Sequence, residues 1–65
     1  MKVFELETLT KAKVENYFKS NYGMEIKTKS GTHYHIVKSK KGYHCFAWFT
    51  WSERKLTKAM KAVFC

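Results

Sequence analysis

Two histidines, His33 and His35, stand two residues apart just after Gly31, in the segment SGTHYHIVKSKKG of residues 30–42. Imidazole accepts and donates protons near neutral pH. Such a histidine could therefore take the proton of an RNA 2′-hydroxyl and protonate the leaving oxygen without a metal ion. The lysines around the pair could hold the phosphate: Lys27, Lys29, Lys38, Lys40 and Lys41. The same spacing is also typical of histidines on the solvent side of a β-strand.

Metal chemistry would need more ligands than the histidines supply. His33, His35 and Cys45 could approach one another across neighbouring strands, but a structural zinc site takes four ligands, commonly with short spacing. No fourth ligand is evident, so neither a metal nor another cofactor is expected. Cys45 and Cys65 are too few for a disulfide framework, and two free thiols in a reducing compartment are expected.

Charge is the strongest global property of the chain. Thirteen Lys and Arg residues stand against five Asp and Glu residues, a formal charge of +8 over 65 residues. Such a charge attracts polyanions, which favours nucleic acid as the partner. A second basic group follows the aromatic segment: Arg54, Lys55, Lys58 and Lys61. Duplex RNA is bound through phosphates and 2′-hydroxyls across successive grooves, which suits two separated clusters, with Glu15 as an acceptor for a 2′-hydroxyl. Solvation of an exposed face would explain the same lysines.

The aromatic segment YHCFAWFTW, residues 43–51, allows another mode of binding. Bases stack on exposed rings, so an exposed Phe49 or Trp51 beside a cationic groove could hold single-stranded nucleic acid. The same rings could form a protein interface or the core of a small domain. Phe46 and Trp48 are assigned to the core.

The chain suffices for one small domain, residues 1–65, and has no proline, repeat or linker. Residues 2–7 are expected to form a short strand or an extended lead-in. No run reaches the ~20 apolar residues of a membrane helix. Acidic residues such as Glu5 lie too early for a secretory signal. A cytoplasmic protein without a membrane partner is therefore expected.

A first helix is predicted from apolar periodicity. It is capped by Thr8 or Thr10, runs to Asn21 or Tyr22 and ends at Gly23, which can adopt the left-handed conformation after a last turn. Its apolar stripe consists of Val14, Tyr17, Phe18 and Tyr22.

A final helix is predicted after the aromatic segment. Ser52 is its natural cap, because a serine hydroxyl can accept a hydrogen bond from the first turn. Its apolar stripe consists of Leu56, Ala59, Met60, Val63 and Phe64.

Three strands, residues 24–29, 33–38 and 43–51, are predicted between these helices. A type I turn with a glycine bulge in the second hairpin would set Ser39 opposite Tyr43. On the core face this register would place Tyr34, Ile36, Phe46 and Trp48, and on the other face His33, His35, Val37, Cys45, Ala47 and Phe49.

The predicted fold class is α+β: a helix, a three-stranded antiparallel sheet and a closing helix, with both helices on one sheet face. This order resembles the double-stranded-RNA-binding domain. That family binds phosphates through a Lys-Lys-x-Ala-Lys run at the start of its last helix, and Arg54-Lys55-Leu56-Thr57-Lys58 is similar. Thr57 stands where the family has its small buried residue, so the order of elements carries the resemblance.

A second resemblance includes the histidines. Residues 14–42 are similar in order and spacing to toxins of the HicA type, which are messenger-RNA interferases on the same fold. Gly31-Thr32-His33 corresponds to that family's Gly-Ser-His element, although Tyr34 separates two histidines that are often adjacent there. The resemblance implies a metal-independent endoribonuclease with His33 as the acid/base and an acidic antitoxin as partner. His35 would be the second proton carrier or a phosphate ligand.

Two alternatives remain open. A non-catalytic RNA- or DNA-binding module would use the same lysines and need no reaction. A small inhibitor from a phage or mobile element would bind a host protein through the aromatic segment and need no nucleic acid.

Overall fold

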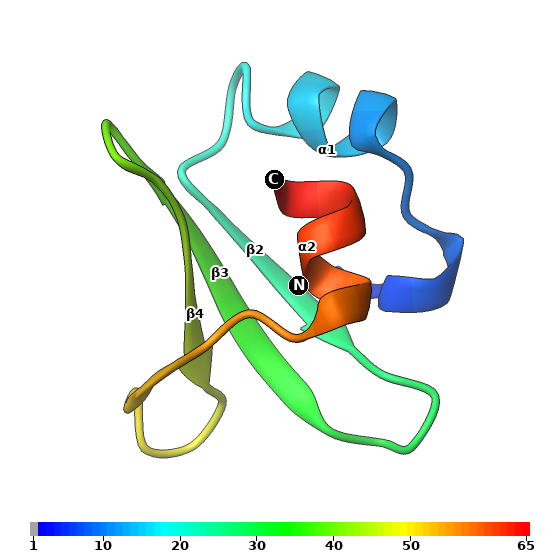
Figure 1. Cartoon of the computed structure of the whole chain (residues 1–65), viewed down its shortest axis with the longest axis vertical. Coiled ribbons are helices and arrows are strands. Elements are labelled where there is room, and N and C mark those ends of the chain that lie inside the picture. The colour runs from blue at the N-terminus through cyan, green and yellow to red at the C-terminus, as the bar shows by residue number, and fades with distance from the viewer. Residues whose placement is uncertain (1) are drawn as a thin grey trace.

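The computed structural model describes residues 2–65 and has the α+β architecture expected from the sequence (Figure 1). A helix, three antiparallel strands and a second helix follow one another as predicted, and two further short strands enlarge the sheet. In chain order the elements are β1 (Val3–Glu5), the 3-10 helix η1 (Leu6–Thr8), α1 (Lys11–Tyr17), β2 (Gly23–Lys27), β3 (His33–Ser39), β4 (Gly42–Ala47), β5 (Glu53–Arg54) and α2 (Lys58–Phe64).

The sheet has five strands in the order β1-β2-β3-β4-β5. β1 runs parallel to β2, and the other neighbours are antiparallel. The predicted number of strands, three, was therefore too low. Residues 2–7 do contain a strand, which is one of the two conformations expected for them. β5 consists of Glu53 and Arg54 alone, and no apolar or β-branched pattern marks two charged residues as a strand.

The β3–β4 hairpin has a different register from the predicted one. Ser39 pairs with Gly42, so the loop has two residues, and Ile36 pairs with Cys45. Gly42 has a φ of +127°, a conformation that glycine adopts without a Cβ clash. Because side chains alternate along a strand, this shift of one residue reverses both faces of β4 relative to the prediction.

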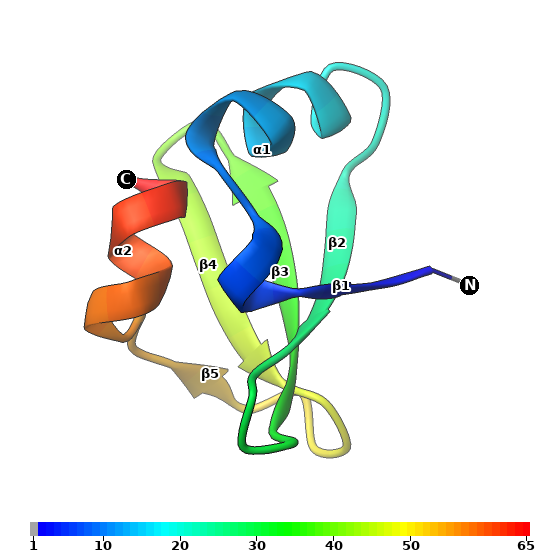
Figure 2. The same ribbon diagram turned by 90° about the vertical axis from the view of Figure 1, so that its right-hand side faces the viewer.

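The sheet consequently has two different faces. Both helices lie on one side of it, as predicted (Figures 1 and 2). The face beneath them, the covered face, carries Met24, Ile26, Tyr34, Ile36, Tyr43 and Cys45. The opposite face, the open face, carries Glu25, Lys27, His33, His35, Val37, Ser39, His44, Phe46 and Glu53. The assignment of Cys45 to the face of the histidines was wrong, as was the assignment of Phe46 to the core.

Helix α1 is shorter than predicted. Its cap is Thr10, whose Oγ1 accepts a hydrogen bond from Lys13 N at 3.2 Å. The helix ends at Tyr17, where the Asn21 side-chain amide donates to the Tyr17 carbonyl at 2.9 Å. Tyr22, assigned to the apolar stripe, is exposed, and Gly23 begins β2 instead of ending the helix.

Helix α2 begins later than predicted because residues 53–54 form β5. Thr57, not Ser52, is its cap and accepts a hydrogen bond from Met60 N at 3.3 Å. Met60 and Phe64 are buried as expected, whereas Ala59 is exposed.

The core lies between the covered face and the two helices. Two leucines from η1 and the residue after it complete the core, so the N-terminal segment is part of the packed structure. The buried side chains are Leu6, Leu9, Val14, Phe18, Met24, Ile26, Ile36, Cys45, Met60 and Phe64. Between residues 2 and 65 no helix is both long enough and apolar enough to cross a membrane.

Candidate functional site

His33 lies at the start of β3 and lines a hollow at one end of the sheet. Two turns form the walls of this hollow, the one between β2 and β3 and the one between β4 and β5. Its volume is about 340 Å³, within the range of small-ligand pockets. We call it the His33 hollow, and its lining is Gly31, Thr32, His33, Ala47, Trp48, Phe49, Thr50 and Arg54.

Hydrogen bonds within the β2–β3 turn fix the position of His33. Thr28 N donates to the Thr32 carbonyl at 2.8 Å, and Gly31 N donates to the Thr28 carbonyl at 2.9 Å. Gly31 has a φ of +91°, which a side chain would strain. Lys29 N donates to Oε2 of Glu7 at 3.1 Å and joins the turn to η1. The turn is therefore held by hydrogen bonds within it and by one hydrogen bond to η1.

The His33 ring has one nitrogen inside the protein and one at the surface. The ring meets Trp48 edge to face, with ring centres 5.1 Å apart. Nδ1 is buried and has no hydrogen-bond partner among residues 2–65. Nε2 is not among the buried unpaired atoms of the same residues, and it makes no hydrogen bond to them, so at least part of its surface reaches solvent. The open nitrogen could exchange a proton with a bound molecule.

Cations and exposed aromatic rings surround this imidazole. Arg54 lines the same hollow, and Lys27 is the cross-strand neighbour of His33 on the open face. Phe49, also in the lining, is 90% exposed. Trp51 is 57% exposed, so both rings that could stack on a base reach solvent. The hollow therefore combines a guanidinium, an imidazole and an aromatic surface, the side chains that phosphates and bases bind.

His35 has a different environment, because both faces of its ring are covered. Trp51 stacks on it with ring centres 3.8 Å apart, and Trp48 stacks at 4.7 Å, both nearly parallel to it. Two indoles on the same face would overlap at these distances, so they lie on opposite faces of the imidazole.

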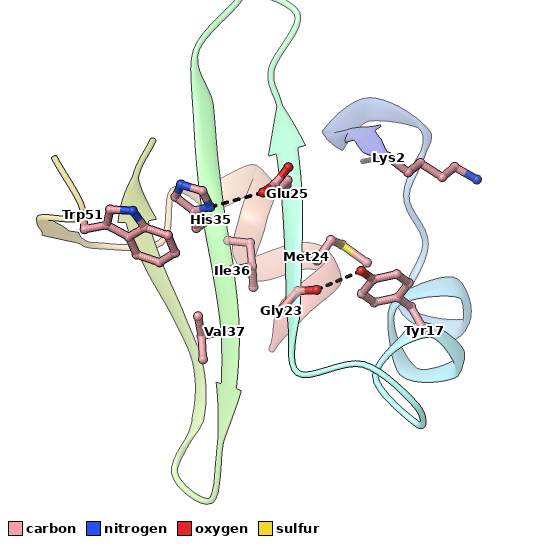
Figure 3. Close-up of a pocket in the computed structure, with 9 residues that line it drawn as sticks. All are labelled: Lys2, Tyr17, Gly23, Met24, Glu25, His35, Ile36, Val37 and Trp51. Carbon is pink, nitrogen blue, oxygen red and sulfur yellow. Dashed lines mark hydrogen bonds and ion pairs between the residues drawn. The ribbon is translucent and has the colours of Figure 1, made fainter. Parts of the chain in front are cut away.

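Both nitrogens of His35 are also engaged. Nε2 lies 3.0 Å from the Trp48 carbonyl, and Nδ1 lies 3.8 Å from Oε1 of Glu25 (Figure 3). The side chain is only 12% exposed. His35 therefore holds the β4–β5 turn against the sheet, and its stacked, largely buried ring is poorly accessible to a substrate.

The β4–β5 turn has an unusual backbone that makes this stack possible. Trp51 has a φ of 55°, in the left-handed region that bulky residues rarely adopt. Ala47 N donates to the Ser52 carbonyl at 2.9 Å, and Trp51 N donates to the Ala47 carbonyl at 3.0 Å. The turn thereby places Trp48 and Trp51 on the open face, so the assignment of Trp48 to the core was wrong.

The other basic residues do not converge on the His33 hollow. Lys38, Lys40 and Lys41 belong to the β3–β4 hairpin, whose tip lies at the end of the sheet away from β5 (Figures 1 and 2). Lys38 Nζ lies 5.8 Å from the ring centre of Tyr43. The other lysines predicted to bind nucleic acid are exposed in the β2–β3 turn, after β5 and on α2: Lys29, Lys55, Lys58 and Lys61. The basic surface is therefore spread over a molecule about 25 Å across.

The cysteines lie apart from the candidate site. Cys45 is buried on the covered face, Cys65 is exposed, and both are free thiols. Burial raises the pKa of the Cys45 thiol. Since His33 and His35 lie on the open face, Cys45 does not converge with them, and no three metal-ligating side chains gather anywhere in the described part of the chain.

Glu15, the other residue singled out for contact with RNA, is exposed on α1 on the helix side of the sheet. Burial and then the negative charge of Glu15 raise the pKa of Tyr43. Glu15 is therefore close to the covered face and remote from the open face that carries His33.

Sequence reasoning missed a third histidine, His44. Its Nε2 lies 2.9 Å from Oγ of Ser39, and its Nδ1 lies 3.3 Å from Oε2 of Glu53. The signal was hidden because these residues come together only in the observed register and only if β5 exists.

Fold and site together define a small α+β protein whose sheet presents three histidines on one uncovered face. No family model, curated protein or solved structure matches the chain. The resemblances to the double-stranded-RNA-binding domain and to HicA-type toxins therefore stay predictions.

Proposed function

We propose that this protein binds RNA at the His33 hollow and cleaves it without a metal ion, with His33 as the acid/base. The single observation that carries the proposal is the open Nε2 of His33 in a hollow that Arg54 and Phe49 also line. An anionic phosphate would contact the guanidinium, and a base would stack on the exposed ring.

The reaction would be an internal transesterification. His33 Nε2 accepts the proton of a 2′-hydroxyl, the 2′-oxygen bonds to phosphorus, and the bond from phosphorus to the 5′-oxygen breaks. The imidazolium then protonates the departing 5′-oxygen. The products are a 2′,3′-cyclic phosphate and a 5′-hydroxyl. Arg54 would stabilise the charge that accumulates on the phosphoryl oxygens.

His35 would have a positioning role in this mechanism. Its ring holds Trp48 and Trp51, and Trp48 in turn packs against His33. The second proton transfer would therefore fall to His33 itself or to water. This revises the expectation that His35 carries the second proton.

The lysines and the fold support binding to RNA more broadly. The hairpin cluster of Lys38, Lys40 and Lys41 and the cluster near Arg54 would contact phosphates at separate positions. We also propose that the fold is similar to that of the double-stranded-RNA-binding domain. The helix, the three-stranded meander and the second helix follow in that order, with both helices on one face of the sheet. An acidic antitoxin would bind the same basic surface.

The test is incubation of the purified protein with end-labelled RNA, with and without EDTA. The proposal expects fragments with cyclic-phosphate ends, in equal amounts under both conditions. Intact and unbound RNA would contradict it and would leave the protein-inhibitor alternative.

A non-catalytic binding module is the second candidate. The observation that favours it is the enclosure of His35 between two indoles, which leaves His33 as the one imidazole lining the hollow, where metal-free cleavage commonly uses two groups. Under this alternative RNA is retained in a salt-sensitive manner and remains intact.

A further inference from the structure

The open face carries a second cluster of reactive side chains, which runs from the β3–β4 hairpin to β5. Ser39 ends β3, His44 lies on β4, and Glu53 lies on β5. His44 pairs with Val37 and Glu53 pairs with Phe46, so the three side chains form a diagonal line across three strands of one face. We propose that Ser39, His44 and Glu53 are a nucleophile–base–carboxylate triad that hydrolyses carboxylic esters.

The hydrogen-bonding capacities of the three groups determine the direction of the proton. The Glu53 carboxylate only accepts, so His44 Nδ1, 3.3 Å from Oε2, carries the hydrogen. Nε2 of a neutral His44 is then an acceptor, and the Ser39 hydroxyl donates to it at 2.9 Å. The alternative acceptor for this hydroxyl, the Gly42 carbonyl, is farther away at 3.3 Å. This is the arrangement that makes a serine hydroxyl a nucleophile.

The surroundings favour an ester that carries negative charge. Lys41 N donates to Oγ of Ser39 at 3.2 Å, which holds the serine side chain beside the turn. Lys40 and Lys41 form the exposed turn beside it. His44 and Glu53 also line a hollow of about 380 Å³, whose other charged residues are Arg54 and Lys55. These cations would attract an anionic substrate to the serine.

The reaction has two balanced steps. Ser39 Oγ bonds to the carbonyl carbon as its proton passes to His44 Nε2, and the bond to the alcohol oxygen breaks as the imidazolium protonates that oxygen. Water then attacks the acyl-serine, again through His44, and releases the carboxylic acid. Since His44 is 35% exposed and Glu53 is 66% exposed, solvent weakens the interactions within the triad. We therefore expect slow turnover.

The experiment is labelling of the intact protein with a fluorophosphonate, followed by mass spectrometry and peptide mapping. A fluorophosphonate reacts as an activated acyl analogue: the serine oxygen bonds to phosphorus, fluoride leaves, and the proton passes to the base. The proposal expects one adduct at Ser39, with a rate at least about tenfold lower in H44Q and severalfold lower in E53Q.

Two controls separate this activity from a fold defect and from the RNA site. S20A removes another exposed serine, and H33A removes the imidazole of the His33 hollow. Both should label at the wild-type rate, and circular dichroism should show that every variant is folded. An adduct at another serine, absence of labelling, or an equal rate in folded H44Q would overturn the proposal.

Discussion

The covered and open faces belong to the same strands but do different things. On β3, Tyr34 and Ile36 point into the core, whereas His33 and His35 point away from it. Ile36 is fully buried, and the core it belongs to is made of apolar side chains. All three histidines and both tryptophans lie on the open face or in the turn that folds over it. The apolar core and the histidines are therefore separated by the alternation of side chains along each strand.

The open face is itself divided. At its centre His35 is packed between two indoles almost as tightly as a core residue. On either side of it, His33 and His44 retain contact with solvent. The three histidines of one face thus have three different environments, which sequence spacing alone does not distinguish.

Two substitutions on β3 give the strongest test of the difference in stability contribution between the two faces. Ile36→Ala removes a fully buried side chain from the covered face and should lower the free energy of unfolding by about 2–5 kcal/mol. His33→Ala on the open face should lower it by less than about 1 kcal/mol. Urea denaturation followed by circular dichroism measures both. Equal losses would mean that the two faces contribute alike to stability.

The central stack of the open face should contribute an intermediate amount. Trp51→Ala removes the ring on His35 but keeps the left-handed backbone, and should lower the free energy of unfolding by about 1–2 kcal/mol. Trp51→Gly removes the same ring and tolerates a φ of 55°, so its loss should be smaller. If glycine destabilises more than alanine, the backbone strain is not present in solution.

Arg54 tests whether the His33 hollow binds phosphate. Arg54→Ala should weaken RNA binding by about 1 kcal/mol and reduce the slope of log affinity against log salt by about 1. Lys19→Ala, which removes an exposed charge after α1, is the matched control and should change affinity less. Gel-shift titrations at several salt concentrations measure both, and identical effects would indicate non-specific attraction.

The smallest expected effect is a loss of stability at alkaline pH that originates on the covered face. The pKa values of Cys45 and Tyr43 are raised mainly by burial, so the folded protein keeps protons that the unfolded chain releases. Stability is then fully present below the ordinary thiol pKa and declines above about pH 9, by less than about 1 kcal/mol. Urea denaturation at neutral and alkaline pH measures the decline. It should be smaller in Cys45→Ala, and a stability that rises with pH would contradict the assignment.

Local patterns in the sequence predicted much of this fold. Thr10 is a helix cap, and β2 and β3 begin within one residue of the expected positions, because hydroxyl capping and alternation are local properties. The order of the central elements and the position of both helices on one face also followed from apolar periodicity.

The errors have one dominant physical source, the two-residue hairpin loop. A loop of Lys40 and Lys41 differs by one residue from the expected turn, and that difference moved Cys45 inward and Phe46 outward. The second source is β5. Glu53 and Arg54 form this strand instead of the first turn of the predicted helix, so Thr57 is the cap of α2. The Ser39–His44–Glu53 cluster depends on both features, and the stacking of His35 depends on the turn that precedes β5.

The most direct test of the RNA proposal is the rate of RNA cleavage by wild type and by His33→Ala, under single-turnover conditions with EDTA and saturating protein. The account predicts that the variant binds RNA nearly as tightly as wild type but cleaves it at least about 100-fold more slowly. A folded His33→Ala protein that cleaves at the wild-type rate would contradict the assignment of His33 as the acid/base.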